Sequence, residues 1–143
     1  MDIAQLLAER DDNAIVTCST DTPMREALSM LAQRRIGALP VLERGRVVGI
    51  FSERDVIYCL EREGEASLAK PVGEVMTAPA ITVDPGTRID EALTLMTRRR
   101  IRHLPVVRGE AMCGFISIGD LVKSRIDRVE AEAEAMRIYI QTA

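Results

Sequence analysis

The sequence repeats itself after 65 residues, and this repeat constrains the fold more than any other feature of the chain. Fourteen positions are identical between the copies, and no gap is needed from residue 17 to residue 57. A repeat of this period indicates one supersecondary unit that occurs twice. The matched segments are TPMREALSMLAQRRIGALPV (22–41) with TRIDEALTLMTRRRIRHLPV (87–106), and GIFSERDVI (49–57) with GFISIGDLV (114–122).

Each copy predicts the same order of elements: strand, helix, strand, strand, helix. Apolar residues in the first helical segment recur at i, i+3, i+4 and i+7, which is typical of a helix that buries one face. Gly45 and Gly109 predict the turns of two hairpins. Pro23 suits the first turn of one helix, and Thr87 with Asp90 forms a potential capping box for its counterpart. The expected strands are 14–18, 39–42 and 47–52, then 80–83, 104–107 and 112–117.

The two copies together predict an α/β (α+β) fold. Neither copy has enough apolar surface to close a core alone, so we expect them to pack sheet against sheet with pseudo-twofold symmetry. The expected division is a first repeat with an N-terminal helix at 1–66, a second repeat at 67–127 and a helical extension at 128–143.

Composition excludes several classes of function. The chain has 143 residues, a formal net charge of −3 and 3% aromatic residues, which disfavours binding of nucleic acid. Cys18, Cys59 and Cys113 lack metal-ligand spacing and are expected to be buried thiols in a reducing compartment. The chain shows neither a signal-peptide pattern nor a long apolar run, so a cytoplasmic protein is expected. No catalytic or metal-binding motif is present, so we expect neither an enzyme nor a catalytic cofactor.

The repeated order of a helix, I-x-x-L-P-V, and then G-h-h-S-x-x-D (h, apolar) at the start of a second helix resembles a CBS (cystathionine-β-synthase) domain pair, or Bateman module. The resemblance covers residues 8–127. It implies a regulatory fold that binds an adenine nucleotide or a related adenosyl ligand in clefts between the repeats. It also implies pairing of modules into homodimers.

The S-x-x-D segments place polar groups where a strand ends and a helix begins. Unpaired backbone N–H groups and the helix dipole favour an anion there. The resemblance assigns Ser52 to the ribose-phosphate and Asp55 to the ribose hydroxyls, with Ser117 and Asp120 as their counterparts in a second, weaker cleft. S-x-x-D is also a capping box that needs no ligand, and this alternative stays open.

The I-x-x-L-P-V segments imply contacts with the adenine ring. In the family the backbone at this point reads the edge of the base, and aliphatic side chains lie against its faces. The resemblance thus assigns residues 36 and 38–40 to the main cleft and residues 82, 101 and 103–105 to the second. These are Ile36, Ala38, Leu39 and Pro40, then Thr82, Ile101, His103, Leu104 and Pro105.

The copies differ just before Leu-Pro, where Gly37-Ala38 aligns with Arg102-His103. In related modules these positions reach across to the phosphates of a nucleotide held by the other repeat. We therefore expect Arg102 and His103, together with Arg54, in the Asp55 cleft, where they would bind phosphate. The Asp120 cleft would receive Gly37 and Ala38, which carry no charge. The arginines at 98–100 are expected to be solvated charges at a helix end.

The last helix is expected to continue past the second repeat. Its apolar residues recur at alternating steps of four and three, the spacing of a coiled-coil seam. We expect this seam to contact a second copy, and packing against the chain's own sheet is equally compatible with the spacing. The seam residues are Val122, Ile126, Val129, Ala133, Met136 and Ile140.

Three functions follow from these features. The first is a ligand-sensing module that transmits occupancy by an adenine nucleotide of the AMP, ADP or ATP class to a partner protein not identifiable from the sequence. The second is a ligand-free module for dimerisation or protein interaction. The third, which net charge and aromatic content disfavour, is binding of nucleic acid through the arginine cluster.

Overall fold

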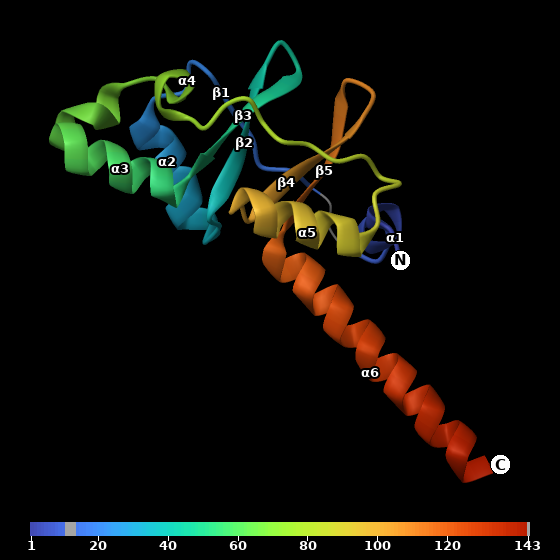
Figure 1. Cartoon of the computed structure of the whole chain (residues 1–143). Coiled ribbons are helices and arrows are strands. Elements are labelled where there is room, and N and C mark those ends of the chain that lie inside the picture. Colours follow the sequence, from blue (N-terminus) through green and yellow to red (C-terminus); the bar gives the residue numbers. More distant parts are fainter. Residues whose placement is uncertain (11–13, 143) are drawn as a thin grey trace.

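A computed structural model describes residues 1–10 and 14–142, and it has the mixed α/β fold with two repeats that the sequence predicts (Figure 1). The first repeat contains β1 (Cys18–Ser19), α2 (Met24–Arg34), β2 (Ala38–Glu43), β3 (Arg46–Ser52) and α3 (Glu53–Glu63). The second contains α5 (Ile89–Arg99), β4 (His103–Arg108), β5 (Ala111–Ser117) and α6 (Ile118–Thr142). Three short helices lie outside these sets: α1 (Ile3–Ala8), the 3-10 helix η1 (Gly64–Ala69) and α4 (Val72–Val75).

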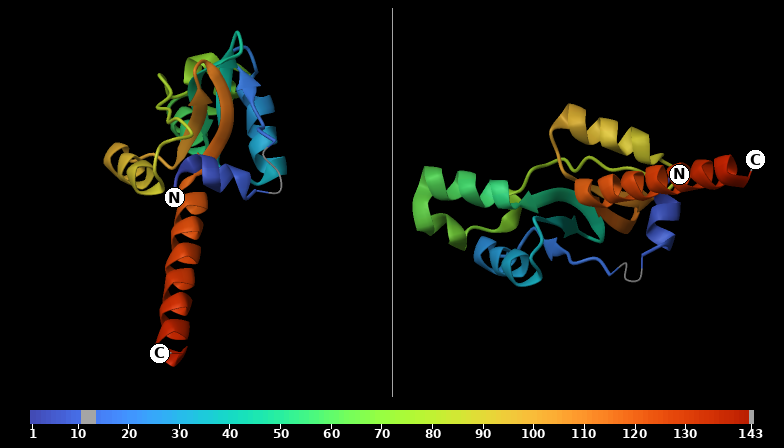
Figure 2. Two further views of the ribbon diagram at one scale, coloured as in Figure 1. Left: turned by 90° about the vertical axis from the view of Figure 1, so that its right-hand side faces the viewer. Right: turned by 90° about the horizontal axis from the view of Figure 1, so that it is seen from below.

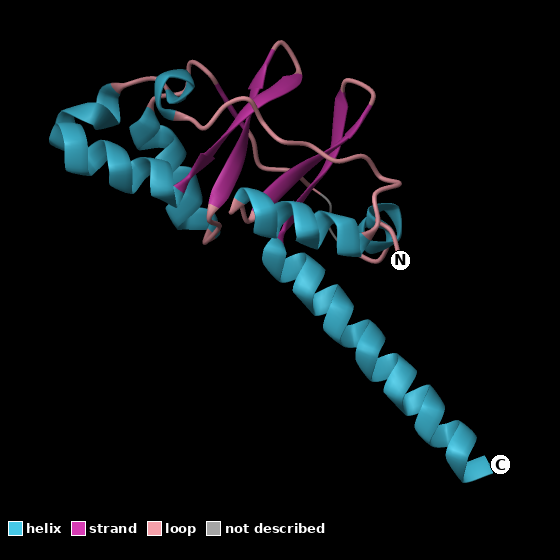
Figure 3. Cartoon of the chain, viewed as in Figure 1, coloured by secondary structure: helices cyan, strands magenta, loops and turns pink. Residues whose placement is uncertain are grey.

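The two hairpins have the same register. Ala38 pairs with Ser52 in the first hairpin, and His103 pairs with Ser117 in the second. Each hairpin has an irregularity after its fourth pair, between residues 41 and 42 and between residues 106 and 107. Figure 3 shows the two hairpins side by side, with helices at their flanks. The repeat in the sequence is therefore a repeat in structure down to individual residue pairs.

The strand that opens each repeat is shorter than expected. β1 has two residues, and the segment at 80–83 forms only a bridge between Val83 and Val106. At this bridge the Val83 N–H donates to the Pro105 carbonyl, and the Val107 N–H donates to the Val83 carbonyl. Pairing of the residues that precede Val83 would need an N–H from Pro105, and pairing of those that precede Cys18 would need one from Pro40. Proline has no backbone N–H. The prolines therefore end the pairing that the sequence analysis expected to continue.

Both expected helix starts shift by one residue. Pro23 is the N-cap of α2 rather than its first helical residue, and Arg88, not Thr87, is the N-cap of α5. No side chain caps either helix. Instead the N–H of Met24 donates to the Lys70 carbonyl at 2.8 Å, and the N–H of Ile89 donates to the Met1 carbonyl at 3.1 Å. Backbone from a distant segment thus replaces the expected capping box.

These distant segments cross between the repeats. α1 precedes the first repeat, yet Ile3 and Leu6 are buried in the core of the second. α4 precedes the second repeat, yet Val72 is buried in the core of the first. The N–H of Ile3 donates to the Thr87 carbonyl, and the N–H of Val72 donates to the Thr22 carbonyl. We retain the expected division at residues 66 and 127 only as a proposal, because each core contains a segment from across that division.

Close approach of the crossing segments explains a glycine that occurs in both repeats. A Cβ on Gly49 would lie 2.6 Å from the Met76 sulfur and 2.9 Å from the Thr77 carbonyl oxygen. A Cβ on Gly114 would lie 2.8 Å from a Leu7 methyl carbon. Glycine is therefore required where the crossing segment packs on each hairpin.

The cysteines are free thiols, and their burial differs from the expectation at one position. Cys18 and Cys59 are buried, but Cys113 is only half-buried because it lies on the partly exposed second strand of its hairpin. Burial and, to a lesser extent, the neighbouring Glu26 carboxylate together raise the pKa of Cys18 to about 11.

α6 extends well beyond the two repeats. Figures 1 and 2 show it as a straight helix that leaves the hairpins and ends far from them. Leu121 is its only buried residue, and every residue from 125 to 142 is exposed. The extension expected at 128–143 is thus, as far as residue 142, the outer part of one continuous helix.

Candidate functional site

Two cavities lie between the repeats, and each is lined by residues of both. The Asp55 cavity has a volume of about 270 Å³, and the Asp120 cavity has a volume of about 390 Å³. Ligand pockets for small molecules usually hold about 300–1,000 Å³, so both cavities are near the lower end of that range.

The two cavities are built from equivalent positions. Nine lining residues of one map onto nine of the other by the 65-residue shift. Each cavity takes the end of the second hairpin strand and the S-x-x-D segment from one repeat, and the segments around the first hairpin strand from the other. The nine pairs are Ala14/Pro79, Val16/Ile81, Arg35/Arg100, Ile36/Ile101, Gly37/Arg102, Ala38/His103, Ile50/Phe115, Ser52/Ser117 and Asp55/Asp120.

Two residues line the cavity opposite to the cleft where they were expected, and a third lines only one of the two clefts where it was expected. Ile36 lines the Asp120 cavity, although it was expected at the Asp55 cleft, and Ala38, which was expected at both clefts, lines the Asp120 cavity alone. Ile101 lines the Asp55 cavity, whereas it was assigned to the Asp120 cleft. The reason is that each S-x-x-D segment faces the other repeat's strand entry and not its own. Arg102 and His103 lie beside Asp55, where the exchange had been expected.

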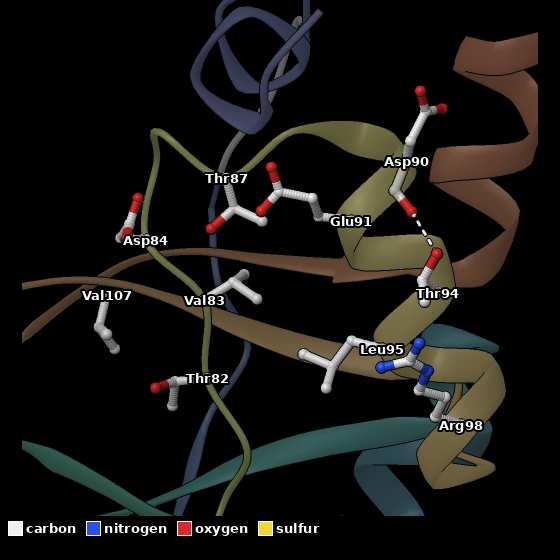
Figure 4. A pocket seen from close by; sticks show the side chains of 10 residues that line it. All are labelled: Thr82, Val83, Asp84, Thr87, Asp90, Glu91, Thr94, Leu95, Arg98 and Val107. Carbon is white, nitrogen blue, oxygen red and sulfur yellow. Dashed lines mark hydrogen bonds between the residues drawn. The ribbon is translucent and has the colours of Figure 1, made fainter.

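Other assigned residues line neither cavity. Leu39 and Leu104 are fully buried in the two cores, and Pro40 and Pro105 are buried beside them. Thr82 lines a separate cavity of about 710 Å³ at the outer side of the second repeat, between the 82–87 loop and α5 (Figure 4). Alternation along the strands turns Leu39 and Leu104 toward the cores, so their side chains cannot reach a ligand between the repeats.

Asp55 is buried, with 8% of its surface exposed, and it caps α3. One carboxylate oxygen accepts the Ser52 N–H at 2.8 Å and the Ser52 hydroxyl at 3.2 Å. The other accepts the Thr77 hydroxyl at 3.0 Å. Backbone and hydroxyl donors thus hold the carboxylate in place at the cavity wall, and the oxygen that accepts only the Thr77 hydroxyl keeps a further lone pair for a ligand hydroxyl.

Asp120 has a charged partner in place of Thr77. Its carboxylate accepts the Ser117 N–H at 2.8 Å and the Arg10 guanidinium at 2.5 Å. Arg10 also donates to the Phe115 carbonyl at 3.1 Å. Thr77 performs the same two tasks in the first cavity, because its N–H donates to the carbonyl of Ile50, the counterpart of Phe115. One arginine side chain in the second cavity replaces a threonine in the first.

The positive charges are distributed differently from the expectation. Arg10 and Arg35 line the Asp120 cavity, so the expectation that this cleft receives no charge is wrong. Arg54, Arg100 and Arg102 line the Asp55 cavity. The Arg54 guanidinium donates to the Arg100 carbonyl at 3.3 Å, which links the two repeats across the cavity mouth. Both cavities can therefore attract an anion, but only the Asp120 carboxylate is already paired with a lining arginine.

His103 lies between the cavities and lines both. Its ring stacks on Phe115 with the centroids 5.5 Å apart and the planes 13° from parallel. Burial lowers the pKa of His103 and the Arg102 charge lowers it further, against the carboxylates of Asp120 and Glu53, which raise it. A neutral imidazole at this point can donate one hydrogen bond and accept another.

Sequence reasoning missed the two residues that complete the carboxylate contacts. Thr77 and Arg10 both lie outside the aligned blocks, so comparison of the repeats could not reach them. A buried carboxylate needs hydrogen-bond partners, so the sequence does indicate that such partners exist. It does not indicate which residues they are. Among residues 1–10 and 14–142, no cluster of side chains suits a metal ion, and no helix has the length and hydropathy needed to cross a bilayer.

The sequence and fold match those of known proteins over nearly the whole chain. The CBS domain model matches residues 11–62 and 72–127. The mitochondrial CBS domain-containing protein CBSX3 of Arabidopsis thaliana is 34% identical over 145 residues, which cover 98% of this chain and 70% of the relative. YhcV of Bacillus subtilis, a CBS domain-containing protein, is 30% identical over 127 residues, which cover 89% and 90% of the two chains. ATU1752 of Agrobacterium tumefaciens, a CBS-domain containing protein of known crystal structure, superposes with a TM-score of 0.82 at 36% identity and covers 87% of this chain and 99% of its own.

Two further crystal structures share the fold and contain ligands. CBSX2 in complex with AMP has a TM-score of 0.75 at 22% identity, covering 88% of this chain and 97% of its own. The CBS domain pair of MJ0100 in complex with 5-methylthioadenosine and S-adenosyl-L-methionine has a TM-score of 0.78 at 22% identity, covering 90% and 98%. At this identity the likeness extends to the fold alone.

Proposed function

This chain belongs to the CBS domain family, and on that premise we propose that it is a regulatory module that binds an adenosine-containing ligand between its two repeats. The observation that carries the proposal is the duplicated cavity, with a fixed carboxylate at a helix start and aliphatic side chains opposite. A carboxylate accepts the two hydroxyls of a ribose, and Ile81 with Ile101 provides apolar surface for a base in the Asp55 cavity.

The complexes of two structural relatives support the class of ligand. CBSX2 binds AMP, and the MJ0100 domain pair binds 5-methylthioadenosine and S-adenosyl-L-methionine. Adenosine is the part that these molecules share, and its ribose suits the carboxylate of this chain. We therefore propose an adenine nucleotide or an adenosyl metabolite as the ligand, held as a regulator and not as a catalytic cofactor.

We assign the tighter site to the Asp55 cavity. Its carboxylate is held by neutral donors, and within residues 1–10 and 14–142 none of the three arginines at its wall forms an ion pair with a carboxylate that lines it. In the Asp120 cavity a ribose must compete with Arg10 for the carboxylate. Arginine forms charge-assisted hydrogen bonds with phosphate, so Arg102 favours a phosphorylated ligand at Asp55.

Calorimetric titration with AMP and with S-adenosylmethionine tests the proposal and the assignment together. Asp55→Asn keeps the shape of the side chain and removes its charge, and we expect it to weaken AMP binding at least tenfold. Asp120→Asn is the matched control and should leave the tighter binding event within threefold of the wild type. If Asp120→Asn abolished binding while Asp55→Asn did not, the assignment would be reversed. If neither compound bound the wild type, the S-x-x-D segments would be capping boxes of a ligand-free module.

Arg102 tests the phosphate contact separately. We expect Arg102→Ala to lower the affinity for AMP and to leave the affinity for adenosine unchanged, because only AMP carries the phosphate. Arg99→Ala removes a neighbouring exposed arginine that lines neither cavity, so it serves as the control. Equal losses for AMP and adenosine would contradict a phosphate contact by Arg102.

Binding in a cavity shared by both repeats has a regulatory consequence. A ligand that contacts both repeats favours the packing in which they form the cavity, and this shifts the population of conformations available to a partner protein.

A further inference from the structure

The outer part of α6 does not pack against the rest of the described chain. From residue 125 to residue 142 every side chain is exposed, which is a length of about 27 Å of helix at 1.5 Å per residue. Helices in proteins gain most of their stability by packing an apolar face against another surface. The structure therefore indicates that another surface covers this segment.

Five of the seven large exposed hydrophobic residues of α6 lie on one seam, and Ile138 and Tyr139 lie outside it. Val122, Ile126, Val129 and Met136 are between 42% and 58% exposed, and Ile140 is 68% exposed. With Ala133 they occupy alternate a and d positions of a heptad repeat, Ile126, Ala133 and Ile140 at a and the others at d. Ile138 is also exposed, at 52%, but it lies at position f on the opposite side of the helix. The seam, defined as these six residues without Ile138, is continuous over the exposed length.

The charges beside the seam identify what covers it. In a parallel two-stranded coiled coil, a residue at g faces the residue at e five positions later in the other helix. Arg125 at g would face Glu130 at e, and Glu132 at g would face Arg137 at e, so both pairs are of opposite charge. Twofold symmetry doubles each pair, giving four attractive contacts. We propose that α6 of a second copy of this chain packs on the seam as a parallel, in-register coiled coil.

The present partners of these residues do not prevent such pairing. Arg125 contacts Asp90 at 3.3 Å. Glu132 contacts Arg128 at 3.4 Å and Arg137 contacts Glu134 at 3.0 Å, both within α6. Five of these six side chains are more than half exposed and Arg128 is 45% exposed, and exposed ion pairs of this kind contribute little. They can be exchanged for pairs across the seam at small cost.

Alternative arrangements fit the charges less well. An antiparallel pair in the register that aligns Ile126 with Met136 places Glu130 opposite Glu130 and Lys123 opposite Arg137, which repel. A membrane surface is disfavoured because interfacial helices carry an excess of basic residues on the polar face. Residues 122–142 contain four basic and four acidic residues, which give no net charge: Lys123, Arg125, Arg128 and Arg137 against Asp127, Glu130, Glu132 and Glu134.

Sedimentation equilibrium of the full-length chain tests the seam. We expect the wild type to be a dimer and Ile126→Asp to weaken dimerisation roughly a hundredfold, because two buried isoleucines are lost per dimer. Ile138→Asp is the matched control, since the same residue type is equally exposed outside the seam, and it should leave the dimer intact. A dimer that Ile126→Asp does not weaken, or that both variants weaken equally, would overturn the proposal. So would a monomeric wild type, whether or not it sediments with phosphatidylglycerol vesicles.

Cross-linking tests the orientation. Under mild oxidation, Ile126→Cys should form a disulfide-linked dimer, because residues at a lie next to their own copies in a parallel, in-register pair. In an antiparallel pair each copy of position 126 lies at least ten residues along the helix from the other, so no cross-link forms. The wild type, whose three thiols are buried or half-buried, is the control. A dimer without a cross-link would overturn the parallel arrangement. The ligand proposal does not enter either test, so the two can fail separately.

Discussion

At the scale of single residues, the two cavities differ through a small number of substitutions on a shared frame. Arg10 performs in the second cavity the two hydrogen-bonding tasks that Thr77 performs in the first. His103 stands where the other repeat has Ala38, and it brings a titratable ring to both cavities. Duplication thus produced two similar sites, and local changes gave them different charge.

His103 provides a direct measurement of this local charge. It is the single histidine of the chain, so its proton resonances can be assigned without ambiguity. We expect a pKa below the ordinary 6.5, because burial and the Arg102 charge disfavour the imidazolium form. Arg102→Gln should raise this pKa, and Arg99→Gln should leave it unchanged. Two-dimensional NMR across a pH series measures both effects, and a pKa at or above 6.5 in the wild type would contradict the arrangement.

The same shift predicts a pH dependence of stability. The folded chain binds the His103 proton less tightly than the unfolded chain does, so the unfolded state takes up more protons as the pH falls. The contribution of His103 is complete above the ordinary pKa of 6.5 and is lost as the pH falls below it. Urea unfolding between pH of about 7 and about 5 should show a decrease in stability that is smaller in His103→Gln. An equal decrease in both proteins would exclude this contribution.

At the scale of elements, the crossing segments determine which glycines the hairpins need. A methyl group on Gly49 meets a backbone carbonyl as well as the Met76 side chain, whereas on Gly114 it meets only the flexible end of Leu7. Backbone cannot yield as a side-chain end can. The cost of added volume should therefore differ between two positions that the repeat makes equivalent.

Alanine substitutions measure this difference. We expect Gly49→Ala to reduce the free energy of unfolding by about 2–3 kcal/mol and Gly114→Ala by about 1 kcal/mol, both by overpacking. Gly119→Ala is the control, because its Cβ meets only the Ser117 hydroxyl at 3.6 Å and alanine favours a helix. Chemical denaturation gives all three values. If Gly114→Ala cost as much as Gly49→Ala, the distinction between backbone and side-chain contacts would be wrong.

Elements were predictable from the sequence where their signal is local. Both hairpins and the helices that follow Ser52 and Ser117 were predicted because turn residues, alternation and S-x-x-D all lie within a few positions of one another. The capping of α2 and α5 was not predictable, because the accepting carbonyls belong to Lys70 and Met1. The early end of the opening strands could have been predicted, since the absence of an N–H on proline is a property of the sequence itself.

At the scale of the whole molecule, the two repeats are joined by exchange of short segments. Ile3 and Leu6 complete the second core from the N-terminus, and Val72 completes the first core from the connection between the repeats. The packing of two units was predictable from the sequence, but the place of α1 was not, because an amphipathic segment of six residues suits either core. The cavities that Ile36 and Ile101 line were not predictable either, since alignment of the repeats identifies equivalent positions and not which copy faces which.

Exchange of segments predicts cooperative unfolding. Ile3→Ala should reduce the free energy of unfolding by about 2–4 kcal/mol through the cavity it leaves in the second core. The whole chain should still unfold in one transition, because α1 belongs to the core of the second repeat and α4 belongs to the core of the first. Glu9→Ala, on the exposed side of the same region, should have little effect. Calorimetry would contradict this description if Ile3→Ala produced two separate transitions, or if its stability equalled that of the wild type.

The central claim is that an adenosine-containing ligand binds between the repeats at Asp55. It is tested most directly by the melting temperature of the wild type and of Asp55→Asn with AMP, ADP, ATP, NAD and S-adenosylmethionine. A ligand present at 100 times its dissociation constant stabilises the folded state by about 2.7 kcal/mol, which corresponds to about 5–10 °C for a chain of this size. We predict a shift of this order for at least one of the five compounds with the wild type and a much smaller shift with Asp55→Asn. No shift with any compound, or an equal shift in both proteins, would contradict the claim.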